Sequence, residues 1–183
     1  MRVIAGQFRS RRLKGTPPAE IRPTSDKLRE TLFNVLGPRV EEAMFLDAYA
    51  GTGAVGIEAI SRGARFVCFV DQSRKACGMI RENLDSLGVV QGFRIMEMEL
   101  AKAVERCERE GVVFDIAFLD PPYEREDLYT EGLELLGSPP LLGDGILVIE
   151  HSKRLRVPET AGPLAKFRSI VQGDSGLAFY RKT

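Results

Sequence analysis

The feature that most constrains the fold of this chain is a regular alternation of short apolar segments with longer helical patterns from residue 44 onward. We expect five short strands, at residues 44–47, 66–70, 93–96, 114–119 and 145–150. Helical patterns separate them at about 54–62, 73–87 and 100–110, and again before the fifth strand. This order predicts βαβ units and a parallel sheet. Because the first four strands are largely apolar, helices should cover both faces of an open α/β fold.

The two ends of the chain depart from this alternation. Residues 1–15 read as a basic hairpin that turns around Gly6 or near Arg9-Ser10. Near the C-terminus, residues 166–171 and 177–181 flank a Gly-Asp-Ser-Gly sequence, which is a strong turn signal. We expect these two segments to form a closing antiparallel hairpin.

The composition is that of an ordinary globular protein with one domain, since the chain has 183 residues, 44% of them apolar. No apolar run approaches the roughly 20 residues of a membrane span, and the N-terminal apolar stretch is too short for a secretory signal. A cytoplasmic protein is therefore expected. The three cysteines lack metal-site or disulfide spacing, and His151 is the single histidine. We expect His151 to be structural and the chemistry to need no metal.

The net charge of zero hides an asymmetry between the N-terminus and the rest of the chain. Residues 1–29 hold eight Lys or Arg against two acidic residues, which gives +6 there and −6 for residues 30–183. A basic arm on an acidic body suggests a polyanionic partner. On charge alone, a solvated charged face explains the pattern equally well.

The stretch from Asp47 to Gly56 is placed to bind a ligand. It follows the first expected strand, and in open α/β sheets ligands bind beyond the carboxyl ends of the strands. Its glycines also fit the dinucleotide fingerprint, so an NAD-dependent oxidoreductase stays open at this point. A carboxylate at Asp47 would repel a diphosphate but could attract the cationic methionine part of S-adenosylmethionine. Asp71 ends the second strand, where it could bind the ribose of either ligand. A purely structural role, with Asp47 or Asp71 capping a turn, also stays open.

A second informative stretch, Asp120-Pro121-Pro122-Tyr123, follows the fourth expected strand. Two consecutive prolines lack backbone N–H groups, so this loop offers carbonyl acceptors without matching donors. Such a loop suits an exocyclic –NH₂ group held through both of its hydrogens, which turns the nitrogen lone pair toward a methyl donor. Tyr123 offers a flat face for a base taken out of its stack.

Together, the stretches from Asp47 to Gly53 and from Asp120 to Tyr123 resemble the amino-group methyltransferases, whose fourth motif is [DN]-P-P-[YFW]. Further segments, at residues 1–6, 22–24, 29–34 and 150–152, look like those of bacterial RsmD-type 16S rRNA guanine-N2 methyltransferases. The resemblance extends over nearly the whole chain. Any one motif is modest evidence, and their common order makes the resemblance specific.

The resemblance implies a Rossmann-like class I methyltransferase with a mostly parallel seven-stranded sheet and a C-terminal antiparallel hairpin. It implies an RNA-contacting extension over residues 1–24 and a methyltransferase domain over residues 25–183. The methyl donor would be S-adenosylmethionine and the partner ribosomal RNA or the small ribosomal subunit. Nothing in the sequence demands a dimer, so a monomer is expected.

The same resemblance assigns roles to particular residues. Asp120, Pro121, Pro122 and Tyr123 would hold the guanine. The cofactor would be bound by Thr24, Asp47, Tyr49, Gly51, Gly53, Asp71, Glu99 and Leu100. Glu99-Leu100 stands where many relatives carry Asp-Ala, so its contact with the adenine amino group is less secure than the role of Asp71. The alternation of Arg9, Arg11, Arg12 and Lys14 along the expected hairpin, taken with the Asp120–Tyr123 loop, predicts that they contact phosphates of the RNA. Arg22 lies in extended chain before a proline and is expected to reach the RNA too.

Three other functions compete with this interpretation. An adenine-N6 or other amino-group methyltransferase would share the Asp-Pro-Pro-Tyr loop, although the chain has no separate DNA-recognition domain and only a small basic arm. An NAD-dependent oxidoreductase is favoured by the glycines alone. A noncatalytic RNA-binding module would not explain the stretch from Asp120 to Tyr123.

Overall fold

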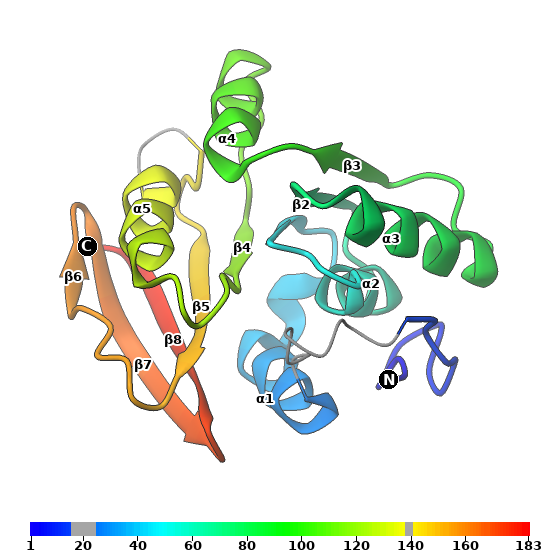
Figure 1. Cartoon of the computed structure of the whole chain (residues 1–183), viewed down its shortest axis with the longest axis horizontal. Coiled ribbons are helices and arrows are strands. Elements are labelled where there is room, and N and C mark those ends of the chain that lie inside the picture. Colours follow the sequence, from blue (N-terminus) through cyan, green and yellow to red (C-terminus); the bar gives the residue numbers. More distant parts are fainter. Residues whose placement is uncertain (16–24, 138–140) are drawn as a thin grey trace.

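The computed structural model describes residues 1–15, 25–137 and 141–183, and they form an α/β fold around one sheet (Figure 1). The strands are β1 (Met44–Ala48), β2 (Phe66–Asp71), β3 (Phe93–Glu97), β4 (Ile116–Leu119), β5 (Ile146–Ser152), β6 (Thr160–Ala161), β7 (Leu164–Gln172) and β8 (Ser175–Lys182). The helices are α1 (Asp26–Leu36), η1 (Gly37–Val40, a 3₁₀ turn), α2 (Ala54–Ser61), α3 (Arg74–Leu87), α4 (Leu100–Arg109) and α5 (Glu126–Gly137).

The sheet order is β3-β2-β1-β4-β5-β8-β7-β6. Strands β1 to β5 pair in parallel, whereas β6, β7 and β8 are antiparallel to their neighbours. The predicted α/β fold and the C-terminal hairpin are therefore confirmed. The described sheet has eight strands, because the two-residue β6 adds to the seven that the family resemblance implies.

The register of the parallel strands brings their carboxyl ends to one edge. Ala48, the last residue of β1, pairs with Val70 of β2 on one side and with Leu119 of β4 on the other. The residues that follow these positions, Tyr49, Asp71 and Asp120, therefore emerge side by side. The strand order reverses between β1 and β4, which is the point where open α/β sheets form a ligand crevice.

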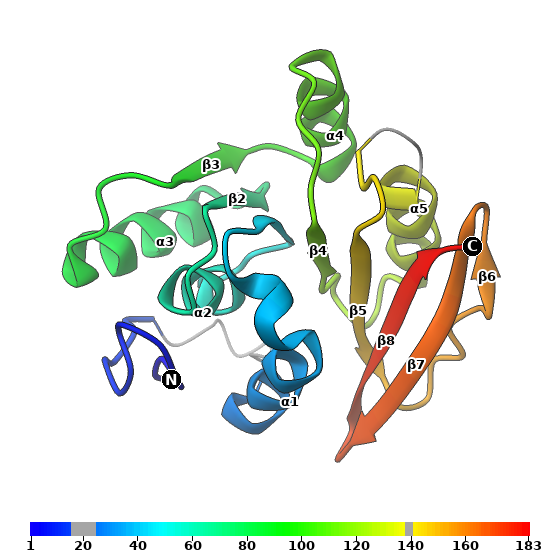
Figure 2. The same ribbon diagram turned by 180° about the vertical axis from the view of Figure 1, so that it is seen from behind.

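Helices cover both faces of the sheet, as the apolar strands predict (Figure 2). Apolar side chains of α1, α2 and α3 pack into one core, and those of α4 and α5 pack into the other. Serine side chains fix the starts of two helices, since Ser25 accepts from the Leu28 N–H and Ser73 accepts from the Ala76 N–H. These two helices therefore begin at defined residues.

Residues 1–15, here called the N-terminal arm, form a hairpin-like loop with one antiparallel bridge, between Arg2 and Arg12. Positive φ angles occur at Gly6 (79°) and Ser10 (69°), the two places where a turn is expected. Val3 and Leu13 of the arm are buried in the core formed with α1, α2 and α3. The arm is thus packed onto the α/β body through its apolar side chains.

Candidate active site at the carboxyl ends of the parallel strands

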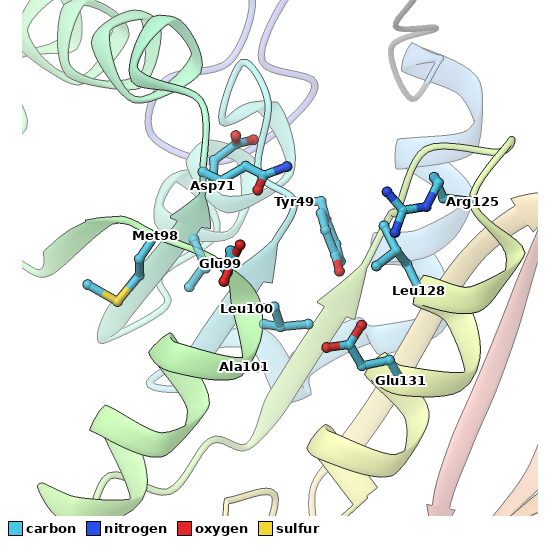
Figure 3. Close-up of a pocket in the computed structure, with 11 residues that line it drawn as sticks. Tyr49, Asp71, Met98, Glu99, Leu100, Ala101, Arg125, Leu128 and Glu131 are labelled. Carbon is cyan, nitrogen blue, oxygen red and sulfur yellow. The ribbon is translucent and has the colours of Figure 1, made fainter.

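A pocket of about 280 Å³ lies at the edge where the parallel strands end (Figure 3). It is lined by Tyr49, Val70, Asp71, Gln72, Met98, Glu99, Leu100, Ala101, Arg125, Leu128 and Glu131. These residues come from the ends of β1 and β2, from the segment between β3 and α4, and from the N-terminal parts of α4 and α5 with the residue that precedes α5. The pocket brings together four of the predicted cofactor residues, Tyr49, Asp71, Glu99 and Leu100.

Asp71 is held in place by backbone donors on both of its carboxylate oxygens. The Gly51 N–H donates to Oδ2 at 2.9 Å, and the Ser73 N–H donates to Oδ1 at 2.8 Å. A carboxylate has about four lone-pair sites, so two remain for a ligand. The side chain therefore couples the glycine loop to β2 and still offers acceptors to the pocket.

Tyr49 lies in the middle of the pocket lining (Figure 3). Its backbone has φ of 60°, a left-handed conformation that is uncommon for a residue with a side chain. Burial, followed by the nearby Glu131 carboxylate, raises the pKa of the Tyr49 hydroxyl to about 12. The hydroxyl is therefore neutral at physiological pH and can donate a hydrogen bond.

Two glycines of the loop, Gly51 and Gly53, and Gly56 in α2 have different roles. Gly51 has φ of 55° and no neighbour closer than 3.9 Å to an added Cβ, so its backbone is open to a ligand. An added Cβ on Gly53 would lie 2.9 Å from Ile80 of α3, and one on Gly56 would lie 2.3 Å from Phe69 of β2. Gly53 and Gly56 therefore allow α2 to pack closely against its neighbours.

Asp47 lies beneath the glycine loop and does not line the pocket. Its side chain is 2% exposed, and its Oδ2 accepts from the Gly56 N–H at 2.8 Å. Burial raises the pKa of the Asp47 carboxyl to about 8, in spite of the hydrogen bond from Gly56. In this geometry Asp47 supports the glycine loop, and its role at the methionine end of the cofactor stays a prediction.

Glu99 and Leu100 line the pocket at the start of α4, whereas one predicted cofactor residue lies outside the described residues. Glu99 is exposed and forms an ion pair with Lys102 at 3.2 Å, whereas Leu100 is buried. Thr24, and Arg22, which is predicted to contact RNA, lie outside the described ranges. The pocket residues Arg125, Leu128 and Glu131 were not predicted, because no local motif marks them and α5 brings them to the site only in the folded chain.

The Asp120–Tyr123 loop follows β4 at the same edge. The Asp120 N–H donates to the Ala48 carbonyl at 3.3 Å, which ties the start of the loop to β1. The buried hydroxyl of Tyr129 donates to the Pro121 carbonyl at 3.3 Å, while Pro122 is exposed. One lone pair of a carbonyl that was expected to be free for a substrate is therefore already occupied, and a second remains.

Tyr123 is anchored by its hydroxyl to strands β5 and β8. The hydroxyl donates to Glu150 Oε1 at 3.1 Å and lies 2.7 Å from Ser175 Oγ. Burial, together with the Glu150 carboxylate, raises the pKa of the Tyr123 hydroxyl. The sequence signal for Glu150 was its place in the family segment 150–152, whereas Ser175 had been assigned only to a turn.

His151 is buried beside this network. Its Nδ1 lies 2.9 Å from the Ser152 carbonyl, and burial lowers the pKa of its imidazole. In the described parts of the chain, Nε2 has no hydrogen-bond partner. A buried, neutral imidazole fits the structural role that was expected for it.

The basic residues predicted to contact RNA are exposed on the N-terminal arm, whereas Arg29, which also belongs to the basic segment, is buried. Arg9, Arg11, Arg12 and Lys14 face solvent, and Arg11 also donates to the Ser86 carbonyl at 2.7 Å. Arg29 had been counted in the basic segment, but it is fully buried in α1, 2.9 Å from Asp26 and 3.8 Å from Glu58. Its charge is thus directed at the buried Glu58 and the partly exposed Asp26.

Two features are absent from residues 1–15, 25–137 and 141–183. No group of three or more His, Cys, Asp or Glu side chains there could hold a metal ion. No helix in these ranges is long and apolar enough to span a bilayer.

Comparisons with known proteins relate the whole chain to one family. Residues 1–181 match the family described as conserved hypothetical protein 95. Ribosomal RNA small subunit methyltransferase D of Escherichia coli (strain K12) is 32% identical over 183 residues, covering 100% of this chain and 90% of that protein. The solved structure of Escherichia coli yhhF has a TM-score of 0.85 and 31% identity, covering 100% of this chain and 97% of that one. A hypothetical protein of Thermus thermophilus has a TM-score of 0.81 and 30% identity over 98% of both chains.

These matches extend from end to end and agree in sequence and in fold, so the chain belongs to the conserved hypothetical protein 95 family, the RsmD family of methyltransferases that its motifs resemble.

Proposed function

We propose that this protein transfers a methyl group from S-adenosylmethionine to the exocyclic N2 amine of a guanine in small-subunit ribosomal RNA. The observation that carries the proposal is the juxtaposition of two features at the switch point of the sheet. The pocket around Asp71 lies at the end of β2, and the Asp120–Tyr123 loop lies at the end of β4, with β1 between them. The family includes an enzyme named ribosomal RNA small subunit methyltransferase D.

The lining of the pocket fits a nucleoside that carries a cationic tail. Asp71 is oriented by two backbone N–H groups and keeps acceptors for ribose hydroxyls. Leu100 gives an apolar wall, and Glu99 gives an acceptor at the rim. Gly51 leaves the backbone open to close approach. When bound there, S-adenosylmethionine supplies the methyl group.

The loop after β4 would hold the substrate amine. The Asp120 side chain and the free lone pair of the Pro121 carbonyl are acceptors, and the proline nitrogens carry no competing donors. Holding both amine hydrogens takes the nitrogen lone pair out of the ring conjugation and fixes its direction. Catalysis would then rest mainly on positioning, which can lower a barrier by several kcal/mol. The product amine can release its proton to water, so no side chain has to act as a base.

The N-terminal arm would hold the RNA backbone. Arg9, Arg11, Arg12 and Lys14 are exposed on one short segment, and neutralisation of phosphates dominates nucleic-acid affinity. Residues 1–24 would therefore be the RNA-contacting part and residues 25–183 the methyltransferase domain. Thr24 and Arg22 keep their predicted roles at the cofactor and the RNA as part of this proposal.

The decisive experiment compares Asp120→Ala and Asp120→Asn in a methyl-transfer assay. Labelled S-adenosylmethionine is supplied with 16S rRNA or 30S particles, and the modified nucleoside is identified by mass spectrometry. We expect Asp120→Ala to lower turnover by about 100-fold, since misorientation alone can cost that much. Asp120→Asn should be milder, because its amide oxygen still accepts. Melting temperature and S-adenosylhomocysteine affinity, measured in parallel, should match the parent.

Each outcome of this assay has a defined meaning. Turnover of Asp120→Ala close to that of the parent would refute the role of the loop. N6-methyladenine in place of N2-methylguanine would favour the alternative amino-group methyltransferase. Calorimetry with S-adenosylhomocysteine and NAD side by side separates a methyltransferase from an oxidoreductase, and binding of NAD alone would overturn the proposal.

A further inference from the structure

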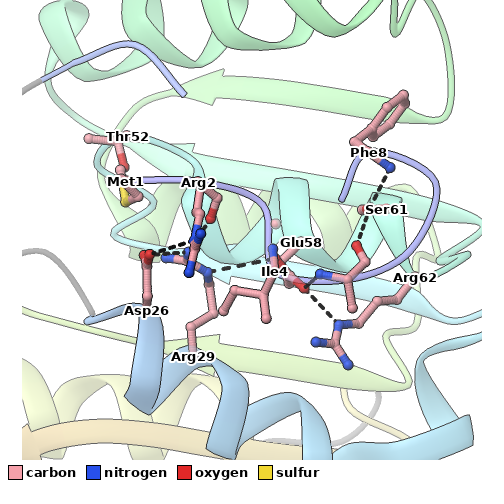
Figure 4. Close-up of polar contacts among 12 residues, drawn as sticks. Met1, Arg2, Ile4, Phe8, Asp26, Arg29, Thr52, Glu58, Ser61 and Arg62 are labelled. Carbon is pink, nitrogen blue, oxygen red and sulfur yellow. Dashed lines mark hydrogen bonds and ion pairs between the residues drawn. The ribbon is translucent and has the colours of Figure 1, made fainter. Parts of the chain in front are cut away.

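The N-terminal arm is fastened to the body by polar side chains of α2 and α3 that lie inside the protein. Glu58 of α2 is fully buried and accepts from the N–H groups of Ile4 at 2.8 Å and Ala5 at 3.0 Å. Ser61 of the same helix accepts from the Phe8 N–H at 3.0 Å (Figure 4). These contacts fix the first half of the arm against α2, and Arg29 of α1 also donates to the Arg2 carbonyl at 2.6 Å.

Asn83 of α3 holds the second half of the arm and differs from the other anchors in its partners. Its side chain is fully buried, and its Oδ1 accepts from the Lys14 N–H at 2.6 Å. Its Nδ2 donates to the Lys14 carbonyl at 3.1 Å and to the Thr52 carbonyl at 3.2 Å. Both amide hydrogens are thus used, one on the arm and one on the glycine loop between Gly51 and Gly53.

The same loop is held from its other side by the proposed cofactor residue Asp71. The Gly51 N–H donates to Asp71, and the carbonyl of the next residue, Thr52, accepts from Asn83. The Thr52 hydroxyl also lies 3.9 Å from the sulfur of Met1, so the loop touches the arm directly. A displacement of the loop therefore disturbs Asp71 on one side and the Lys14 backbone on the other.

We propose that Asn83 is a positioning residue that joins the N-terminal arm to the glycine loop, so that RNA on the arm and cofactor on the loop bind cooperatively. The inference rests on the proposed function, which makes RNA and S-adenosylmethionine the two ligands. If the arm leaves its place, Asn83 is left with unsatisfied buried polar atoms, which is costly. A ligand that stabilises the loop in this position therefore stabilises the docked arm, and by linkage the reverse also holds.

The test uses Asn83→Asp in the full chain, with Ser61→Ala as the matched control. The aspartate is isosteric and keeps the acceptor for the Lys14 N–H, but it places an oxygen where Thr52 needs a donor. We expect it to weaken S-adenosylhomocysteine binding about three- to tenfold, the range for a lost hydrogen bond. Ser61→Ala removes a contact to Phe8 in the first half of the arm and leaves the Asn83 bonds to Lys14 and Thr52 in place, so S-adenosylhomocysteine affinity should stay at the parental value.

The coupling itself is read from the affinity for 16S rRNA with and without saturating S-adenosylhomocysteine. The parent should bind RNA about fivefold or more tightly with the cofactor product present, within the usual range of coupling between sites. In Asn83→Asp this ratio should fall toward one. A purely structural role would lower melting temperature or both affinities but would leave the ratio unchanged, and an unchanged ratio overturns the proposal.

A second pair of variants covers the case in which Asn83→Asp does not fold. Lys14→Pro removes the N–H that donates to Asn83, whereas Lys14→Ala removes the same side chain and keeps the N–H. S-adenosylhomocysteine should bind more weakly to Lys14→Pro than to Lys14→Ala, and equal affinity would refute the link. Failure of the proposed function looks different, because the parent itself would then bind no S-adenosylhomocysteine.

Discussion

The contacts of the Tyr123 hydroxyl lead to a prediction that separates the contribution of the hydroxyl from that of the ring. Tyr123→Phe keeps the flat face proposed for the substrate base. It removes the donor to Glu150 Oε1 at 3.1 Å and the contact with Ser175 Oγ at 2.7 Å. Because Glu150 is only 2% exposed, water cannot easily replace the lost donor. We therefore expect the variant to lose both stability and turnover.

The magnitude follows from the charge and burial of the partner. A hydrogen bond to a charged group is worth about 1.5–3 kcal/mol. For a chain of this size, each kcal/mol moves the melting temperature by about 2–4 °C, so a fall of roughly 3–12 °C is expected. The loop that carries Asp120 is then less well fixed, and turnover should fall about tenfold or more, since a small misplacement can cost up to 100-fold.

The assay is a double-mutant cycle with Ser175→Ala, read by thermal melting and by methyl transfer to 30S particles. The two single changes should be non-additive, since both remove the same contact. Tyr129→Phe serves as a comparison, because it loses a hydroxyl bonded to the Pro121 carbonyl in the same loop. If Tyr123→Phe matched the parent in melting and turnover while Tyr123→Ala were inactive, the ring alone would matter and the anchoring argument would be wrong.

Three further predictions follow from the site and the arm. Asp71→Ala should weaken S-adenosylmethionine binding by about 1.5–3 kcal/mol in titration calorimetry, and unchanged affinity would remove it from the cofactor site. Joint neutralisation of Arg9, Arg11 and Arg12 should weaken RNA binding and flatten its salt dependence while sparing cofactor affinity; an identical salt slope would show that the arm does not touch RNA. Because the Asp47 pKa is raised from 3.8 to about 8, the native state keeps a proton that the unfolded chain releases as pH rises through this window. Unfolding free energy should therefore fall between about pH 4 and pH 8; Asp47→Asn should show a flatter pH profile, and parallel profiles would contradict the burial argument.

Local patterns were enough to predict the sheet and most of the helices. Strand β1 was expected at 44–47 and observed at Met44–Ala48, and the C-terminal hairpin was expected and observed over β7 and β8. Strand β4 begins two residues later than expected, because the Phe114 N–H donates to Leu141 and leaves the ladder. The strands could be predicted because the alternation of apolar segments and helical patterns depends only on residues that are neighbours in the sequence.

The site was only partly predictable, since its missing parts depend on contacts between distant segments. Asp71 could be placed because a strand end is a local signal. The burial of Asp47 could not, since it depends on how α2 folds back to bring Gly56 over the carboxyl. Likewise, Glu150 and Ser175 reach Tyr123 across 27 and 52 residues of chain. A motif within one segment cannot predict a contact between residues so far apart in the sequence.

The two-residue strand β6 has a consequence for the outer edge of the sheet. Strand β7 is nine residues long and carries exposed Phe167 and Val171. Such an edge is a ready template for pairing with a strand of another molecule. Strand β6 occupies one end of it by pairing with Leu164 and Ala165, and a register shift between Lys166 and Arg168 interrupts the regular edge beyond. A short covering strand and an irregular edge that carries Lys166 and Arg168 are both features that disfavour pairing with a strand of another molecule.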